Sequence, residues 1–270
     1  MDLTLVLSFL ALGAAVGFIA GMLGLGGGMV LIPFISLLLM ARDFPHELVM
    51  HMAIATSLAT IMFTSISAVR AHHQRGAVAW DIVKKFTPGI LLGAWIGPWV
   101  GKQMNTVVLA SVFAVFVTFS AVQMLLDIKP SPKREMPKEA GLLAAGGVIG
   151  LMAGLLGAGG AFISVPFMTW CNVNLQRALA TSSALGFPIA LAGTLSNIYY
   201  GMSTPNLPAG SVGFVYLPAL LVISIGSVLT AHLGAHAAHK MPVKLLRKMF
   251  ACMLLGLAAH MMYGIFTNRV

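Results

Sequence analysis

The chain has 270 residues, of which 59% are hydrophobic and only 9% are charged. Soluble globular domains carry roughly a quarter charged residues, so this composition excludes a soluble domain and indicates a polytopic membrane protein. The net charge of +9 does not indicate nucleic-acid binding, because lysine and arginine occur in short clusters between apolar segments. The two cysteines have no CxxC spacing, so neither a disulfide framework nor a metal site is indicated.

Ten apolar segments follow one another along the chain. A membrane span needs about 20 residues, and the second and seventh segments are shorter than this. These two are either thin spans or half-helices. The stretch 127–139 carries three prolines and seven charges, and we predict that it is a cytoplasmic linker between the halves 1–126 and 140–270. We predict helices at residues 3–23, 26–40, 48–69, 82–101, 107–126, 140–156, 159–170, 178–200, 212–235 and 245–266.

The two halves repeat one another. The first glycine segment, Gly21–Pro33, reads GMLGLGGGMVLIP, and the second glycine segment, Gly154–Pro166, reads GLLGAGGAFISVP at an offset of 133 residues. The pair Gly93 and Gly226 continues this offset. Internal duplication on this scale is typical of secondary transporters.

The distribution of basic residues indicates how the halves are oriented. If the halves are inverted, 13 of the 16 lysines and arginines lie on the cytoplasmic side, whereas parallel halves put only 9 there. Cytoplasmic loops carry an excess of lysine and arginine. We therefore predict two inverted-topology repeats with both termini outside.

Adjacent glycines weaken a helix, and exposed backbone is tolerated at membrane depth only against protein or a water-filled cavity. We predict that both glycine segments end one helix and start another, with free N–H groups aimed at an anion. The alternative is close packing through small residues, which we assign to four-residue ladders such as Gly93, Gly97 and Gly101. The predicted substrate-binding glycines are Gly26, Gly27, Gly28, Gly159 and Gly160.

Hydroxyl groups follow each glycine segment. Thr56 and Ser57 match Thr181 and Ser182 at an offset of 125 residues, and we predict that these four donate hydrogen bonds to substrate. The alternative is that they bond back to a carbonyl of their own helix. Asn197 adds a polar contact to the substrate or marks the membrane interface.

All seven acidic residues lie in termini, loops or segment ends, so no buried carboxylate offers a proton or sodium relay. Histidine titrates near neutral pH, and His51 precedes Thr56 by little more than one helical turn. We predict His51 as a candidate for proton coupling. The alternative is a hydrogen-bonded histidine without such a role.

The chain contains no Gly-x-Ser-x-Gly, His-Glu-x-x-His or nucleotide-binding motif, so we predict a transporter and not an enzyme. No cofactor and no metal ion is expected. The predicted partners are a small anionic substrate, the lipid bilayer and a coupling ion, either proton or sodium, with no nucleic acid. An anion channel is the alternative, and the oligomeric state is left open.

The glycine-rich run ending in Pro33, the Ala-Thr-Ser segment ending in His72-His73-Gln-Arg-Gly76, and the Gly93-xxx-Gly97-xxx-Gly101 segment resemble the TauE/SafE sulfite exporter family. Members are also described as 4-toluene sulfonate uptake permease-like. The resemblance covers nearly the whole chain. It implies a secondary transporter of small organic or sulfur-containing anions, such as sulfite, sulfoacetate or other sulfonates, in a bacterial inner membrane.

Overall fold

The computed structural model describes residues 3–23, 27–42, 44–126, 135–238 and 243–266. Within this part, four helices are long and apolar enough to cross a membrane, namely His46–Gln74, Thr106–Leu125, Glu139–Leu156 and Leu175–Gly201, and shorter apolar stretches lie in other helices. Each helix coincides with one predicted segment, which confirms an all-α polytopic architecture. The helices are α1 (Leu3–Leu23), α2 (Gly28–Met40), α3 (His46–Gln74), α4 (Trp80–Lys102), α5 (Thr106–Leu125), α6 (Glu139–Leu156), α7 (Ala161–Trp170), α8 (Leu175–Gly201), α9 (Leu217–Ala238) and α10 (Val243–Phe266).

The short helices α2 and α7 both start after a glycine with a left-handed backbone. Gly27 has φ 67° and ψ −10°, and Gly160 has φ 73° and ψ −8°. Gly157, which ends α6, is also left-handed at φ 64°. Glycine reaches this conformation without the clash that a Cβ causes. The glycines therefore interrupt the apolar helices as predicted, although Gly26 itself lies outside the described residues.

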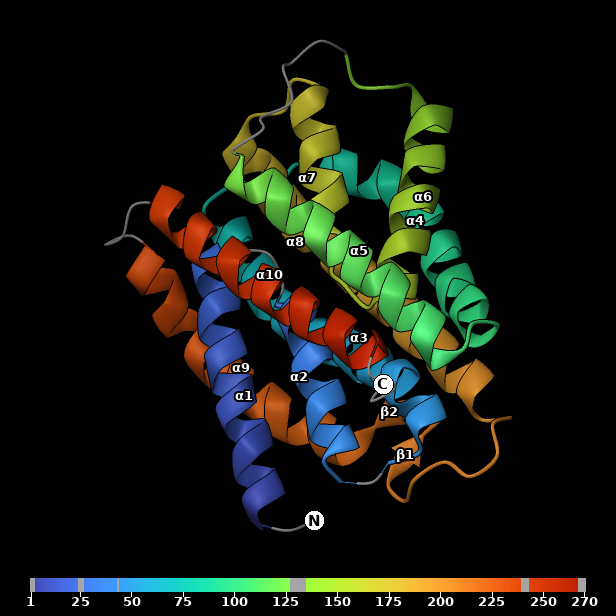
Figure 1. Ribbon diagram of the computed structural model, residues 1–270. Coiled ribbons are helices and arrows are strands. Elements are labelled where there is room, and N and C mark those ends of the chain that lie inside the picture. Colours follow the sequence, from blue (N-terminus) through green and yellow to red (C-terminus); the bar gives the residue numbers. More distant parts are fainter. Residues whose placement is uncertain (1–2, 24–26, 43, 127–134, 239–242, 267–270) are drawn as a thin grey trace.

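The fourth helix of each half packs most extensively on the first helix of the other half. α4 lies along α6, and α9 lies along α1 (Figure 1). Gly146 and Gly150 of α6 lie directly against the α4 backbone, and Gly13 and Gly17 of α1 lie against the α9 backbone. Without a Cβ the two backbones can approach closely. The predicted packing role of the four-residue glycine ladders is confirmed.

The same contacts set the register between the two halves. Gly89 of α4 lies against Leu143, whereas Gly226 of α9 lies against Leu10. Because Leu10 and Leu143 are counterparts at the 133-residue offset, Gly226 corresponds to Gly89. The predicted match of Gly226 with Gly93 is therefore wrong by one helical turn. Glycines spaced four residues apart look the same after such a shift, so the sequence pattern could not resolve it.

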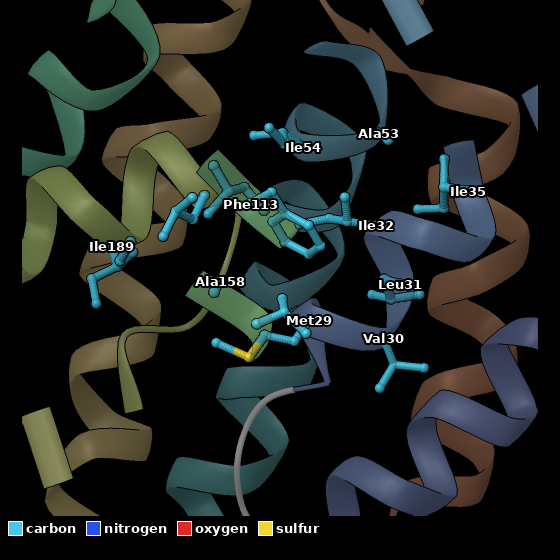
Figure 2. Close-up of a cluster of buried hydrophobic side chains, with 14 of the residues drawn as sticks. Met29, Val30, Leu31, Ile32, Ile35, Ala53, Ile54, Phe113, Ala158 and Ile189 are labelled. Carbon is cyan, nitrogen blue, oxygen red and sulfur yellow. The ribbon is translucent and has the colours of Figure 1, made fainter. Parts of the chain in front are cut away.

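The counterpart helices α3 and α8 cross in opposite directions. Gly193 of α8 lies against Leu58 of α3, while Gly186, earlier in α8, lies nearest Ser65, later in α3. The counterparts α5 and α10 are also in contact and antiparallel (Figure 1). A large hydrophobic cluster packs these elements together, including Phe113 of α5 (Figure 2).

The connection between α8 and α9 contains a small β-hairpin that the sequence analysis did not predict. β1 (Ser211–Val212) pairs antiparallel with β2 (Val215–Tyr216). Gly213 turns with φ 56° and lies against the backbone of Ile198 in α8. The helix predicted from residue 212 therefore starts only at Leu217. Strands of two residues are too short to leave an alternating hydropathy pattern.

We expect Gly93→Ala to lower the melting temperature of the detergent-solubilised protein, because a Cβ there would overlap the Gly147 carbonyl group. Overpacking of this kind costs about 1–3 kcal/mol. Gly256→Ala is the control, since a Cβ at Gly256 would meet no atom within 4 Å. Equal melting temperatures for the two variants would contradict the direct backbone contact.

Candidate functional site

The described parts of the two glycine segments meet inside the protein. A Cβ placed on Gly28 would lie only 2.8 Å from the carbonyl oxygen of Gly157. Residues 153–161 are all buried. Met29, at the start of α2, and Ala158, in the second glycine segment, belong to the same hydrophobic cluster (Figure 2). We call the region formed by residues 27–29 and 157–162 the glycine junction.

The hydroxyl group of Ser57 bridges the two sides of the glycine junction. Ser57 is fully buried in α3, and its Oγ lies 3.1 Å from the carbonyl oxygen of Gly157 and 3.4 Å from that of Gly28. Carbonyl oxygens only accept, so the single hydroxyl proton is shared between the two, with the shorter contact to Gly157. Ser57 therefore holds the end of α6 and the start of α2 together.

Its counterpart, Ser182, has a different partner. The Oγ atoms of Ser182 and Ser164 are 2.6 Å apart, and both side chains are buried. Ser164 lies in the first turn of α7, where its N–H donates to the carbonyl oxygen of Gly160 at 2.9 Å. One of the two hydroxyls donates to the other, which leaves one proton for a further acceptor. Ser164 is not among the predicted site residues, although it is the only hydroxyl-bearing residue in the second glycine segment.

Thr56 and Thr181 form matching bonds that cross between the halves. Thr56 Oγ1 accepts from the N–H of Tyr216 at 3.1 Å, and Thr181 Oγ1 accepts from the N–H of Ala79 at 3.0 Å. Both threonines are fully buried. Each one thus anchors the residue that precedes the fourth helix of the other half. This geometry uses the hydroxyl oxygens as acceptors and leaves both hydroxyl protons available.

Backbone donors are also available at the glycine junction. The carbonyl oxygens of Gly27 and Gly160 each accept bonds from the third and fourth N–H groups of their helices. Within the described part of the chain, no acceptor is paired with the N–H groups of Ala161 and Phe162 at the start of α7. A helix start carries partial positive charge, so these groups favour an anion. Gly159 lies in the same buried stretch.

The described acidic side chains lie at helix starts or, for Glu135, in the connection before α6. Glu47, Asp81 and Glu139 occupy the first turns of α3, α4 and α6, where the helix dipole favours negative charge. Among the described residues, no three His, Cys, Asp or Glu side chains gather closely enough to hold a metal ion. The polar groups of the glycine junction are therefore N–H, O–H and carbonyl groups.

Two predicted site residues lie away from the glycine junction. Asn197 is 15 positions after Ser182 on the same helix, about 22 Å along its axis. Its side chain donates to the carbonyl oxygen of Gly193 at 2.8 Å. His51 lies about 9 Å before Ser57 along α3. Its Nε2 is 3.1 Å from the carbonyl oxygen of Gly101, and its Nδ1 is buried without a described partner.

Comparisons with known proteins give a consistent result. The family model described as "Sulfite exporter TauE/SafE" matches residues 9–261. A Haemophilus influenzae protein named "Probable membrane transporter protein" is 36% identical over 260 residues, which cover 96% of this chain and 98% of that relative. YunE of Bacillus subtilis is 26% identical, with coverage of 95% and 97%. YfcA of Escherichia coli is 28% identical, with coverage of 96% and 89%. No solved structure matches the chain.

We expect Thr56→Val to lower the melting temperature, because it leaves the N–H of Tyr216 buried without its acceptor. An unsatisfied buried donor costs about 1–3 kcal/mol. Thr56→Ser keeps the oxygen and should recover most of this loss. Thr118→Val is the control, since that hydroxyl only bonds back to Ala114 in its own helix. A loss no larger than in this control would contradict the bond between the halves.

Proposed function

Because the chain belongs to the TauE/SafE family of membrane transporters and is not an enzyme, we propose that it is a secondary transporter of a small organic or sulfur-containing anion. Sulfite, sulfoacetate and other sulfonates are the proposed substrates. The chain is a multi-pass integral membrane protein with bacterial homologues. We propose the bacterial inner membrane as its location.

The glycine junction is the observation that carries this proposal. The first turns of α2 and α7 begin there, and helix starts attract negative charge. Ser164 and Ser182 leave one hydroxyl proton free beside the start of α7, whereas the Ser57 proton is donated to the carbonyl oxygen of Gly157. The oxygens of sulfite and sulfonates accept hydrogen bonds from such donors. The described carboxylates lie in loops and first turns, so the arrangement suits an anion better than a cation.

Inverted repeats are part of the same proposal. The counterparts α3 and α8 run antiparallel, so an axis that exchanges them must be perpendicular to both helices. When both helices cross the membrane, such an axis lies in the membrane plane. Transporters with inverted repeats bind substrate near the repeat interface, at the ends of broken helices. The excess of basic residues on one side supports the same orientation.

Burial at the glycine junction favours a carrier over an anion channel. Ser57, Ser164 and the stretch 153–161 are buried, so the proposed site is closed in this conformation. Alternating access requires a state of this kind between the two open states. A conducting channel would instead need a continuous polar path past these residues.

Uptake of radiolabelled sulfite into proteoliposomes tests the proposal. We expect uptake that saturates with concentration and shows counterflow from preloaded vesicles. Gly27→Ala and Gly160→Ala should reduce it, because each Cβ would stand in a left-handed backbone and within 2.7 Å of a neighbouring side chain. Left-handed geometry alone costs about 1–2 kcal/mol for such a residue.

Gly76→Ala is the matched control for these two variants. Gly76 is also left-handed, at φ 63°, but a Cβ there would meet nothing within 4 Å. It therefore carries the backbone strain without the contact at the glycine junction. Full uptake by Gly27→Ala and Gly160→Ala would contradict the proposed site, and an ohmic current without saturation would favour the channel.

We propose His51 as the group that couples protons to transport, with sodium as the alternative coupling ion. The Nε2–H group of His51 donates to the carbonyl oxygen of Gly101. The Nδ1 atom of the same ring therefore carries a proton only when the ring is cationic. The nearest charged or titratable residues along the elements that contact it are Glu47 and His46, four and five positions earlier in α3, and Lys102, which follows Gly101 in α4. A cationic ring attracts an anion, so sulfite uptake should fall as pH rises. His51→Gln cannot titrate and should flatten this dependence; an unchanged pH profile would discard His51.

A further inference from the structure

Five buried polar side-chain atoms in the described part of the chain have no hydrogen-bond partner. His51, Thr194 and Ser224, which carry three of these atoms, are each no more than 9% exposed. Buried polar groups are nearly always hydrogen-bonded, to protein, water or ligand. The five atoms are His51 Nδ1, Thr194 Oγ1, Thr204 Oγ1, Ser211 Oγ and Ser224 Oγ.

These atoms lie on α3, on α8, on the connection that carries the β-hairpin, and on α9; α3 and the hairpin strand β2 each pack against both α8 and α9. A small cluster lies there, made of Ala55, Ala59, Phe214, Val215 and Leu220. The His51 ring lies 5.4 Å from the ring of Phe214. Thr194 precedes Ile198, which packs on this cluster, by one helical turn, and Ser224 follows Leu220 by one turn.

Thr204 and Ser211 belong to the connection between α8 and α9 that carries Phe214. All five atoms therefore lie on elements that contribute to one cluster. We call this region the hairpin junction. It is distinct from the glycine junction, but α3 joins the two: Thr56 bonds to Tyr216 of the hairpin, and the next residue, Ser57, bonds to Gly157.

The repeated fold does not by itself require these unpartnered hydroxyls. The counterpart of Thr194 in the first half is Val69, which has no hydroxyl. The counterpart of Ser224, in the register that the helix contacts set, is Thr87. Its hydroxyl donates to the carbonyl oxygen of Val83 at 2.7 Å. Unpartnered polar atoms are thus a property of the hairpin junction and not of the repeat.

The charge at the edge of the hairpin junction favours an anion. Lys102 Nζ donates to the carbonyl oxygen of Tyr200 at 2.9 Å and to Ser203 Oγ at 2.7 Å, next to Thr204. The nearest described carboxylate on α3, Glu47, is exposed in the first turn of that helix. Hydroxyls, an imidazole and an ammonium group suit a hydrated oxyanion.

We infer that the hairpin junction is a second binding site, for a hydrated sulfonate or similar oxyanion on its route to the glycine junction. This assignment rests on the proposed function, because it takes the glycine junction as the destination. Thr194 and Ser224 supply the hydroxyls, and Lys102 draws the anion to the edge.

Cysteine accessibility tests this assignment without measuring transport. In a Cys171→Ala, Cys252→Ala background, Thr194→Cys and Ser224→Cys are treated with a membrane-impermeant sulfonate-bearing methanethiosulfonate reagent. The matched controls are Ser196→Cys and Ser227→Cys, on the same two helices, whose serines are also buried but bond to Trp95 and Gly13. We expect the test positions to react at least about tenfold faster, because the control positions must first open locally.

Sulfoacetate, which does not attack the reagent as sulfite does, should slow labelling of the test positions. A cationic reagent of similar size should also label them more slowly. Test positions that react no faster than the controls would overturn the hairpin junction as a site. Equal reactivity toward both reagents, without protection by sulfoacetate, would overturn its assignment to an anion. If sulfoacetate protects the test positions but the protein does not take up sulfite, the result would instead contradict the glycine junction as the destination of the anion.

Discussion

Backbone hydrogen bonding in an apolar interior is the constraint on which the rest of this structure depends. A membrane offers no water to satisfy the N–H and C=O groups at a helix end, so helices normally cross it without interruption. This chain interrupts two helices inside the protein, at Gly27 and around Gly157–Gly160. Each broken end must find partners from elsewhere in the molecule. The hydroxyl of Ser57 supplies one for the carbonyl group of Gly157 at the end of α6, and a bound anion would do the same for the helix starts.

Hydroxyl groups thus connect distant parts of the chain where salt bridges would do so in a soluble protein. Thr56 and Thr181 hold the residues that precede α9 and α4, and Ser196, Ser227 and Thr230 each donate to a carbonyl oxygen of a neighbouring helix. A neutral hydroxyl can be buried at far lower cost than a charge. Such bonds give the packing direction without placing ions in the membrane.

The fourth helix of each half packs on the other half, and this limits how the helices can move relative to one another. α4 packs on α6 and α9 packs on α1, so each packed group contains helices from both halves of the sequence. The contacts are backbone to backbone at glycines and leave little room for sliding. Any rearrangement that opens the glycine junction therefore acts on mixed groups of helices, with the α3–α8 crossing between them.

The sequence predicted the helices well because their signals are local. Apolar length and glycine position place α1 to α10 within a few residues, and they identify the interruptions before α2 and α7. The register of α9 could not be predicted, since Gly89 and Gly93 offer the same spacing to Gly226. The hairpin at Ser211–Tyr216 was missed because two-residue strands leave no pattern. Ser164 carried a signal, a hydroxyl in an apolar run after Gly160, but nothing in the sequence showed that it would meet Ser182.

The sequence by itself therefore determined the class of protein, the positions of its helices and the places where the backbone must break. These follow from hydropathy and from the conformational freedom of glycine, which act over a few neighbouring residues. Only the tertiary structure decided that Ser57 reaches Gly157, 100 positions away, and that the His51 ring lies against Phe214 of the hairpin turn. Contacts of that kind depend on how whole helices pack, and packing is set by all the residues along each interface at once.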